Sequence, residues 1–162
     1  MKNIIILIVL LISSSSYSQK KYKDLKSEYN AQVECLGTGV KGSFVFKVYT
    51  SQRKRNPDLS KSKRAAIFTV IFNGIPGVPG VGCDTQPPLL SEDAYEQNKE
   101  YFDSFFSTGK FSQFISLSNS GSPDIVKMNK GYEIGLNVTV RRDALSKKLE
   151  DDGIRVGLRS IF

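Results

Sequence analysis

The sequence contains no histidine and no tryptophan among its 162 residues. Without histidine, Ser-His-Asp and Cys-His catalytic arrangements and histidine-ligated metal sites are excluded. The missing tryptophan also removes a large aromatic platform for stacking on sugars, although tyrosine and phenylalanine are present. Most familiar hydrolase designs are therefore excluded, and carboxylate pairs are the remaining route to general acid–base catalysis.

Cysteine is scarce, because Cys35 and Cys83 are the only two. In an oxidising compartment such a pair is most simply a disulfide, and two buried reduced thiols are the alternative. A metal site is disfavoured, since two thiolates would need further soft or imidazole ligands. We therefore predict a Cys35–Cys83 disulfide, no metal site and no cofactor.

The one long apolar run lies at the start of the chain. Lys2 precedes nine apolar residues, Ile4 to Ile12, and small polar residues follow up to Ser18. This order is typical of a signal peptide cleaved before Gln19, and the run is far shorter than the roughly 20 residues of a spanning helix. No cysteine follows it for lipid attachment. We expect a periplasmic or extracellular protein with no transmembrane segment after cleavage.

Three segments are expected along the chain: a signal peptide over 1–18, a flexible basic arm or short helix over 19–30, and a single domain over 31–162. The expected fold is α+β, a single sheet of about four to six mostly antiparallel strands with two or three helices on one face. Alternating or β-rich patterns predict strands over 31–36, 43–50, 111–117, 125–128, 132–141 and 154–162.

Helix start and stop signals place three helices. The first is expected to begin at Asn56-Pro57 and end at Gly74, although residues 67–72 are also good strand material. The second is predicted over 91–107, and the third is short, capped by Asp143 and closed by Gly153. Residues 74–90 form a long loop rich in glycine and proline, a type of segment that is often functional.

Positive charge is concentrated in the first half of the chain. The formal net charge is +7, and residues 19–83 hold twelve Lys and Arg against four acidic residues. The candidate anion- or partner-binding residues surround the predicted helix start, where free backbone N–H groups also favour anions; they are Arg53, Lys54, Arg55, Lys61, Lys63 and Arg64. A solvated turn is the alternative interpretation. Because export argues against a genome-binding role, we expect an envelope partner and no nucleic acid.

Residues 84–109 reverse this balance, with six acidic residues and one lysine. Glu92, Glu96, Glu100 and Asp103 follow a spacing of three and four, which would place them on one side of a helix. Such a row is usually a solvated face, and catalysis or calcium binding by it is the less favoured hypothesis.

Two segments carry a resemblance to a known family. Residues 47–72, a strand followed by SQRKRNPDLSKSKRAAIFTVIF, and residues 132–154, YEIGLNVTVRRDALSKKLEDDGI, resemble segments of the N-terminal domain of flagellar assembly protein T and related lipoproteins. The resemblance implies a small periplasmic domain near envelope secretion or surface-fibre systems, and it carries over no catalytic residues. The serine-rich signal and the Lys/Ile/Asn-leaning composition are similar to those of exported Bacteroidota proteins.

We therefore expect a non-enzymatic exported protein that serves as a binding or accessory domain in secretion or surface assembly. The partner would be an envelope or secretion-system protein, contacted through the basic residues and the 74–90 loop, with peripheral association with the outer membrane. One alternative is a binder of an acidic glycan or phosphate-bearing lipid. The other is a carboxylate-based hydrolase that uses the acidic residues of 92–103.

Overall fold

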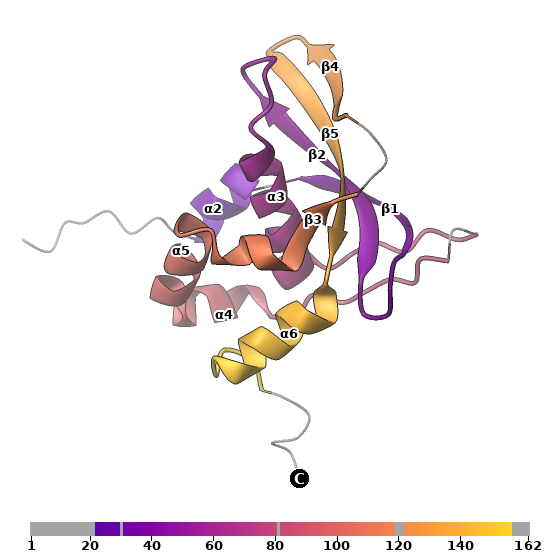
Figure 1. Ribbon diagram of the computed structural model, residues 1–162. Helices are drawn as coiled ribbons and strands as arrows, with labels where there is room; N and C mark the ends of the chain where they lie inside the picture. The colour runs from indigo at the N-terminus through magenta and orange to yellow at the C-terminus, as the bar shows by residue number, and fades with distance from the viewer. Residues whose placement is uncertain (1–21, 30, 81, 119–121, 157–162) are drawn as a thin grey trace, which may run out of the picture.

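The centre of the fold is a five-stranded antiparallel sheet (Figure 1), seen in a computed structural model that describes residues 22–29, 31–80, 82–118 and 122–156. Its strands are β1 (Gln32–Thr38), β2 (Phe44–Gln52), β3 (Ile115–Leu117), β4 (Asp124–Met128) and β5 (Gly131–Val140). Strand β5 pairs with β2 on one edge, and with β3 and β4 on the other. The predicted α+β fold with antiparallel strands is confirmed.

The sheet has one apolar face and one more polar face. On the apolar face, alternate residues of β2 and β5 such as Phe46, Val48 and Val138 are fully buried. Their neighbours Lys47 and Tyr49 point to the opposite face and are only partly buried. The period of two seen in the sequence therefore separates core from surface, as expected for a sheet covered on one side.

Five α-helices lie among the described residues, where the sequence predicted two or three: α2 (Tyr22–Tyr29), α3 (Leu59–Phe68), α4 (Glu92–Gln97), α5 (Lys99–Ser107) and α6 (Arg142–Asp151). Helix α3 contacts β2 and β5, and α2, α4 and α5 lie on the same side of the sheet (Figure 1). The segment expected as a flexible arm or a short helix is helical over 22–29. No described helix is long and apolar enough to cross a membrane.

The α3 segment begins two residues later than predicted. Asp58, not Asn56, is the N-cap residue, because its Oδ1 accepts hydrogen bonds from the backbone N–H groups of Ser60 and Lys61 at 3.0 and 3.2 Å. The helix continues as a π-helical turn over Thr69–Asn73 and stops at Gly74, whose φ of 79° suits a glycine. The ambiguous residues 67–72 are thus helical and buried.

Aromatic side chains fill the space between the helices. The Phe72 ring lies 5.0 Å from Phe68 and 5.1 Å from Phe102, measured between ring centroids. Tyr29 of α2 is buried 5.7 Å from Phe68 and 5.5 Å from Phe106. These spacings are those of favourable aromatic pairs. They attach α2 to the helical layer.

The predicted helix over 91–107 is wrong as a single element. The backbone of Asn98 leaves the helical region with φ −126° and ψ 34°, which divides the segment into α4 and α5. The predicted strand over 111–117 is correct only in its last three residues. Lys110–Phe114 is a 3₁₀ turn, whose three-residue repeat buries both Phe111 and Phe114.

The C-terminal elements also differ from the prediction. Asp143 lies in the first turn of α6 and does not cap it, because the cap position is Arg141 and the Asp143 N–H donates to the Gly42 carbonyl at 3.1 Å. Residues 154–156 do not form a strand. The Ile154 N–H instead donates to the Leu149 carbonyl at 2.8 Å and closes the helix end. The rest of the predicted strand, 157–162, lies outside the described residues.

The loop over 74–90 folds back on itself and is tied to the sheet. Ile75 pairs with Gln86 and Val78 pairs with Cys83, which makes a small hairpin. Cys83 and Cys35 of β1 are both buried and lie at disulfide-bonding distance, with their Cα atoms 6.3 Å apart. The predicted Cys35–Cys83 pair is therefore present in the structure, and it joins the hairpin to an edge strand.

Removing this cross-link is expected to cost stability, since it closes a loop of 48 residues. The double variant Cys35→Ala, Cys83→Ala should lose about 2–4 kcal/mol of unfolding free energy in urea denaturation. In wild-type protein unfolded without reductant, alkylation should leave the mass unchanged, and after reduction it should modify both thiols. Two modified thiols before reduction would contradict the disulfide.

Candidate binding surface

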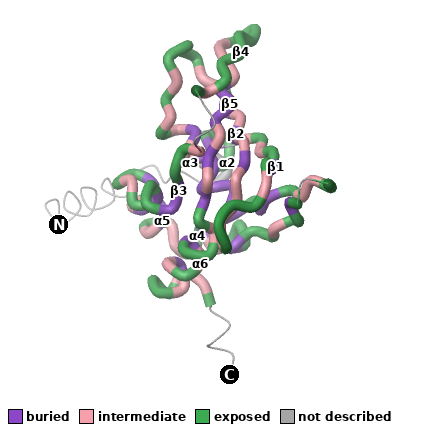
Figure 2. Tube along the Cα trace, turned by 45° about the vertical axis from the view of Figure 1, so that its right-hand side comes forward, coloured by how far each residue is buried: buried purple, intermediate pink, exposed green. Residues whose placement is uncertain are grey.

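Five basic residues gather at one end of the sheet, and we call them the cationic tip: Arg53, Lys54, Arg55, Lys127 and Lys130. The first three occupy the loop that leaves β2, and the other two belong to the β4–β5 hairpin. All five side chains are exposed, and both segments stand at the same end of the molecule (Figures 1 and 2).

Strand register brings the two halves of the tip together. Gln52, the last residue of β2, pairs with Tyr132 at the start of β5. A Cβ atom on Gly131 would lie 2.4 Å from the Gln52 carbonyl oxygen and 3.3 Å from the Arg53 Cα. The backbone of the hairpin turn therefore lies against the start of the Arg53–Arg55 loop.

The base of that loop is held by hydrogen bonds. The Gln52 side chain accepts from the Asp58 backbone N–H at 2.7 Å and donates to the Asp58 carbonyl at 3.2 Å. Behind it, the buried hydroxyls of Thr50 and Ser62 lie 2.8 Å apart and join β2 to α3. The basic side chains thus project from a loop whose two ends are fixed.

The tip's positive charges are not neutralised by neighbouring acids. None of the five side chains forms an ion pair with another described residue. Asp58, the acidic residue that follows the Arg53–Arg55 loop in the sequence, is used as the N-cap of α3. A surface of this kind attracts anions and accelerates their encounter at low ionic strength.

The other three predicted basic residues are not part of this tip. Lys61 donates from Nζ to the Ser51 carbonyl at 3.0 Å, so it supports the end of β2. Arg64 is half-buried with its guanidinium carbon 6.0 Å from the centre of the Phe111 ring, and Lys63 is half-buried on α3. The structure therefore brings together half of the predicted set.

Sequence reasoning missed Lys127 and Lys130. Their hairpin was predicted, but the pairing of β5 with β2 is a contact between residues about 80 positions apart and has no local signal. The 74–90 loop, which was predicted as a second contact element, projects past β1 and away from the cationic tip (Figure 1).

The acidic row does not form a continuous helical face, because Asn98 separates its members onto α4 and α5. Glu92 pairs with Lys26 at 2.5 Å. Asp103 accepts from the Tyr95 hydroxyl at 2.7 Å and pairs with Lys99, and burial together with Asp103 raises the pKa of Tyr95. These contacts are structural ones that fix the helical layer.

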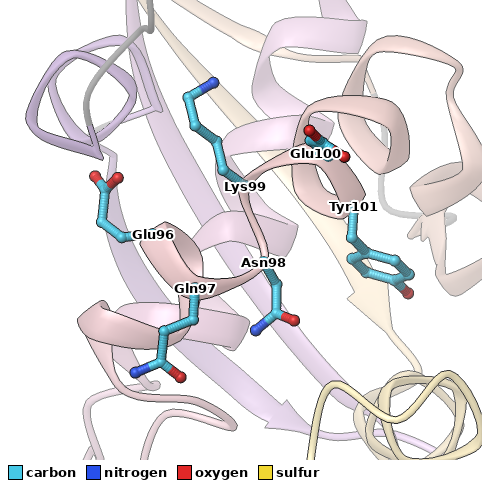
Figure 3. Close-up of a pocket in the computed structure, with 6 residues that line it drawn as sticks. All are labelled: Glu96, Gln97, Asn98, Lys99, Glu100 and Tyr101. Atoms are coloured by element: carbon cyan, nitrogen blue, oxygen red, sulfur yellow. The ribbon is translucent and has the colours of Figure 1, made fainter.

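A shallow surface hollow lies at the α4–α5 break, lined by six consecutive residues, Glu96 to Tyr101 (Figure 3). The side chains in this close-up diverge, with Lys99 and Gln97 pointing in opposite directions. General acid–base work needs groups that converge on one reacting atom. The hollow lacks that arrangement.

A second open hollow of about 620 Å³ lies between α5 and α6. Asp152 at its edge accepts hydrogen bonds from Lys148 Nζ at 2.5 Å and from the Tyr101 hydroxyl at 2.6 Å, and both contacts lower the pKa of Asp152. Burial raises the pKa of Tyr101, and the contact with Asp152 raises it further. These polar groups satisfy one another, so they hold α6 to α5.

No known protein family, curated protein or solved structure matches this chain. The cationic tip is therefore judged on its own geometry. Its five exposed basic side chains form no ion pair with another described residue.

The backbone packing of the tip depends on a glycine at position 131. Gly131→Ala would place a methyl group 2.4 Å from the Gln52 oxygen at a φ of +126°, and it should lower the unfolding free energy by roughly 2–3 kcal/mol. Gly80→Ala is the matched control, because Gly80 also has a positive φ but nothing within 4 Å of its Cβ position. It should cost about 1 kcal/mol. Equal losses in urea denaturation would contradict the close packing at the tip.

Proposed function

We propose that this chain is an exported, non-enzymatic binding domain that contacts an acidic component of the cell envelope through its cationic tip. The observation that carries the proposal is the set of five exposed basic residues without acidic partners, presented by two neighbouring chain segments. In this role the domain acts as an accessory component of secretion or surface assembly.

Export is the premise that selects the partner. The apolar run from Ile4 to Ile12 and the small residues up to Ser18 support a signal peptide. The paired Cys35 and Cys83 suit an oxidising compartment. In that compartment the anions available to a basic surface are acidic proteins, acidic glycans and lipid phosphates, not a genome.

The export premise is tested on the full-length chain expressed in a bacterium with two membranes. The protein should be recovered in the periplasmic or extracellular fraction, and N-terminal sequencing should begin at Gln19. Leu7→Arg interrupts the apolar run and should leave the chain unprocessed in the cytosol. Recovery of uncleaved wild-type chain from the cytosol would contradict export.

The binding surface is tested with fluorescent poly-L-glutamate and alginate, which represent acidic protein and acidic glycan. Wild-type protein should bind at least one of them at about 50 mM salt and release it at about 500 mM, because exposed charges are screened. Replacing Arg53, Lys54 and Arg55 together by glutamine should weaken binding at least tenfold, since each exposed cation contributes on the order of 0.5–1 kcal/mol.

The matched control replaces three exposed lysines elsewhere, Lys41, Lys110 and Lys147, by glutamine. This variant has the same net charge as the tip variant, and it should bind as tightly as wild type. If the two triple variants bind equally well, binding follows overall charge, and the cationic tip is not the contact surface.

A further inference from the structure

Large apolar side chains are exposed on β4, beside the cationic tip. Ile125, Val126 and Met128 are 40, 52 and 50 % exposed. All five residues of β4 are exposed, whereas the neighbouring β5 buries four of its apolar side chains. Apolar residues that gather on one exposed element mark interaction surfaces more often than scattered ones do.

These residues lie at the end of the molecule that carries the cationic tip. Strand β4 pairs with β5 on one side, from Asp124 opposite Gly135 to Met128 opposite Gly131. Val126 and Met128 are two residues apart and therefore share a face of β4, and Met128 directly precedes the turn at Asn129 and Lys130. Figure 2 shows β4 as a wholly exposed segment at the top of the view, near the exposed loop after β2.

Apolar and cationic side chains are thus interleaved on one hairpin. Lys127 lies between Val126 and Met128 in the sequence and points to the opposite face of β4, and Lys130 lies in the turn. Tyr132, partly buried, adds an aromatic ring with a polar end at the start of β5. This is the composition of surfaces that lie at the boundary between lipid headgroups and acyl chains, where cations contact phosphates and apolar and aromatic groups enter the boundary.

We propose that the cationic tip and the β4 hairpin together bind an anionic lipid surface. Arg53, Lys54 and Arg55 with the two hairpin lysines contact the headgroup phosphates, and Val126 and Met128 enter the boundary with the acyl chains. The inference rests on the proposed function, because it uses the same surface, and it names a lipid surface as the acidic component.

Two acidic residues, Asp124 and Glu133, share the face of the β4–β5 hairpin that carries Val126 and Met128, and both lie away from the turn. Asp124, at the end of β4 away from the turn, forms an ion pair with Lys47. Glu133 is the only acidic residue of 125–135, and it lies opposite Val126 and Ser51 in the sheet, on the same face as Val126 and three residues from Lys130. The hairpin residues farthest along the chain from both acids are Met128 and Asn129, and Met128 is therefore the apolar side chain most favourably placed to contact lipid.

The test compares vesicles of phosphatidylcholine with vesicles that contain about 30 % phosphatidylglycerol, using exported protein that begins at Gln19. Wild-type protein should cosediment with the anionic vesicles and hardly with the neutral ones. Val126→Ser with Met128→Ser should weaken binding to anionic vesicles about tenfold, because two partly exposed apolar side chains no longer leave water. The same variant should bind poly-L-glutamate as wild type does.

Two control variants test whether vesicle binding depends on these particular side chains. Val40→Ser with Val156→Ser removes two exposed apolar side chains far from the tip in sequence, which are 84 and 75 % exposed, and should bind vesicles normally. The variant with glutamine at Arg53, Lys54 and Arg55 should lose binding both to anionic vesicles and to poly-L-glutamate.

Two outcomes would overturn the lipid inference and leave the proposed function intact. One is wild-type binding to poly-L-glutamate or alginate without binding to anionic vesicles. The other is vesicle binding that the Val126 and Met128 substitutions do not change, which would show attraction by charge alone. Equal binding to neutral and anionic vesicles would also overturn it.

Discussion

The pairing of β2 with β5 is the interaction on which the rest of the structure depends. It runs from Phe44 opposite Val140 to Gln52 opposite Tyr132. This register puts the apolar alternation of both strands on one face, where α3 and the aromatic helical layer cover it. A shift by one residue would turn Phe46 and Val48 toward solvent, so the register and the core specify each other.

The same pairing determines what each end of the sheet carries. At one end, the chain leaves β2 beside the β4–β5 turn, which creates the cationic tip from two segments far apart in sequence. At the other end, β5 leads into α6, and the Asp143 N–H donates to the Gly42 carbonyl in the β1–β2 turn. One end is thus closed by a helix, and the other remains exposed.

Local patterns were enough to predict much of this fold. Alternation identified β2 and the β4–β5 hairpin, the Gly74 stop ended the α3 segment, and cysteine counting gave the Cys35–Cys83 pair. These features are set by neighbouring residues or by composition, which a single sequence displays directly.

The wrong predictions fall on residues whose conformation is set by tertiary contacts and not by the local sequence. The break at Asn98 interrupts a stretch with good helical spacing, and Phe111 and Phe114 are drawn into the core by a 3₁₀ turn where a strand was predicted. Two of the five residues of the cationic tip could not be predicted either, since Lys127 and Lys130 join Arg53–Arg55 only through the strand register.

Ion pairs occur on other parts of the described surface but not among the five residues of the cationic tip. On the open face of the sheet, Lys47 is paired with Asp124 and the Tyr49 hydroxyl donates to Glu34 at 2.9 Å. Some charges of the helices are paired in the same way, as Lys26 is with Glu92 and Lys148 with Asp152.

Exposed ion pairs contribute little to the free energy of unfolding. The lack of ion pairs at the tip is therefore not enough by itself to indicate a function. What distinguishes the tip is that unpaired cations and exposed apolar side chains occur together. Charge alone would attract any polyanion, and apolar exposure alone would favour aggregation along the free edge of β4. Repulsion between equally charged tips opposes that aggregation, while an anionic lipid surface satisfies both kinds of group at once. The combination therefore favours attachment to a surface over association between copies of the chain.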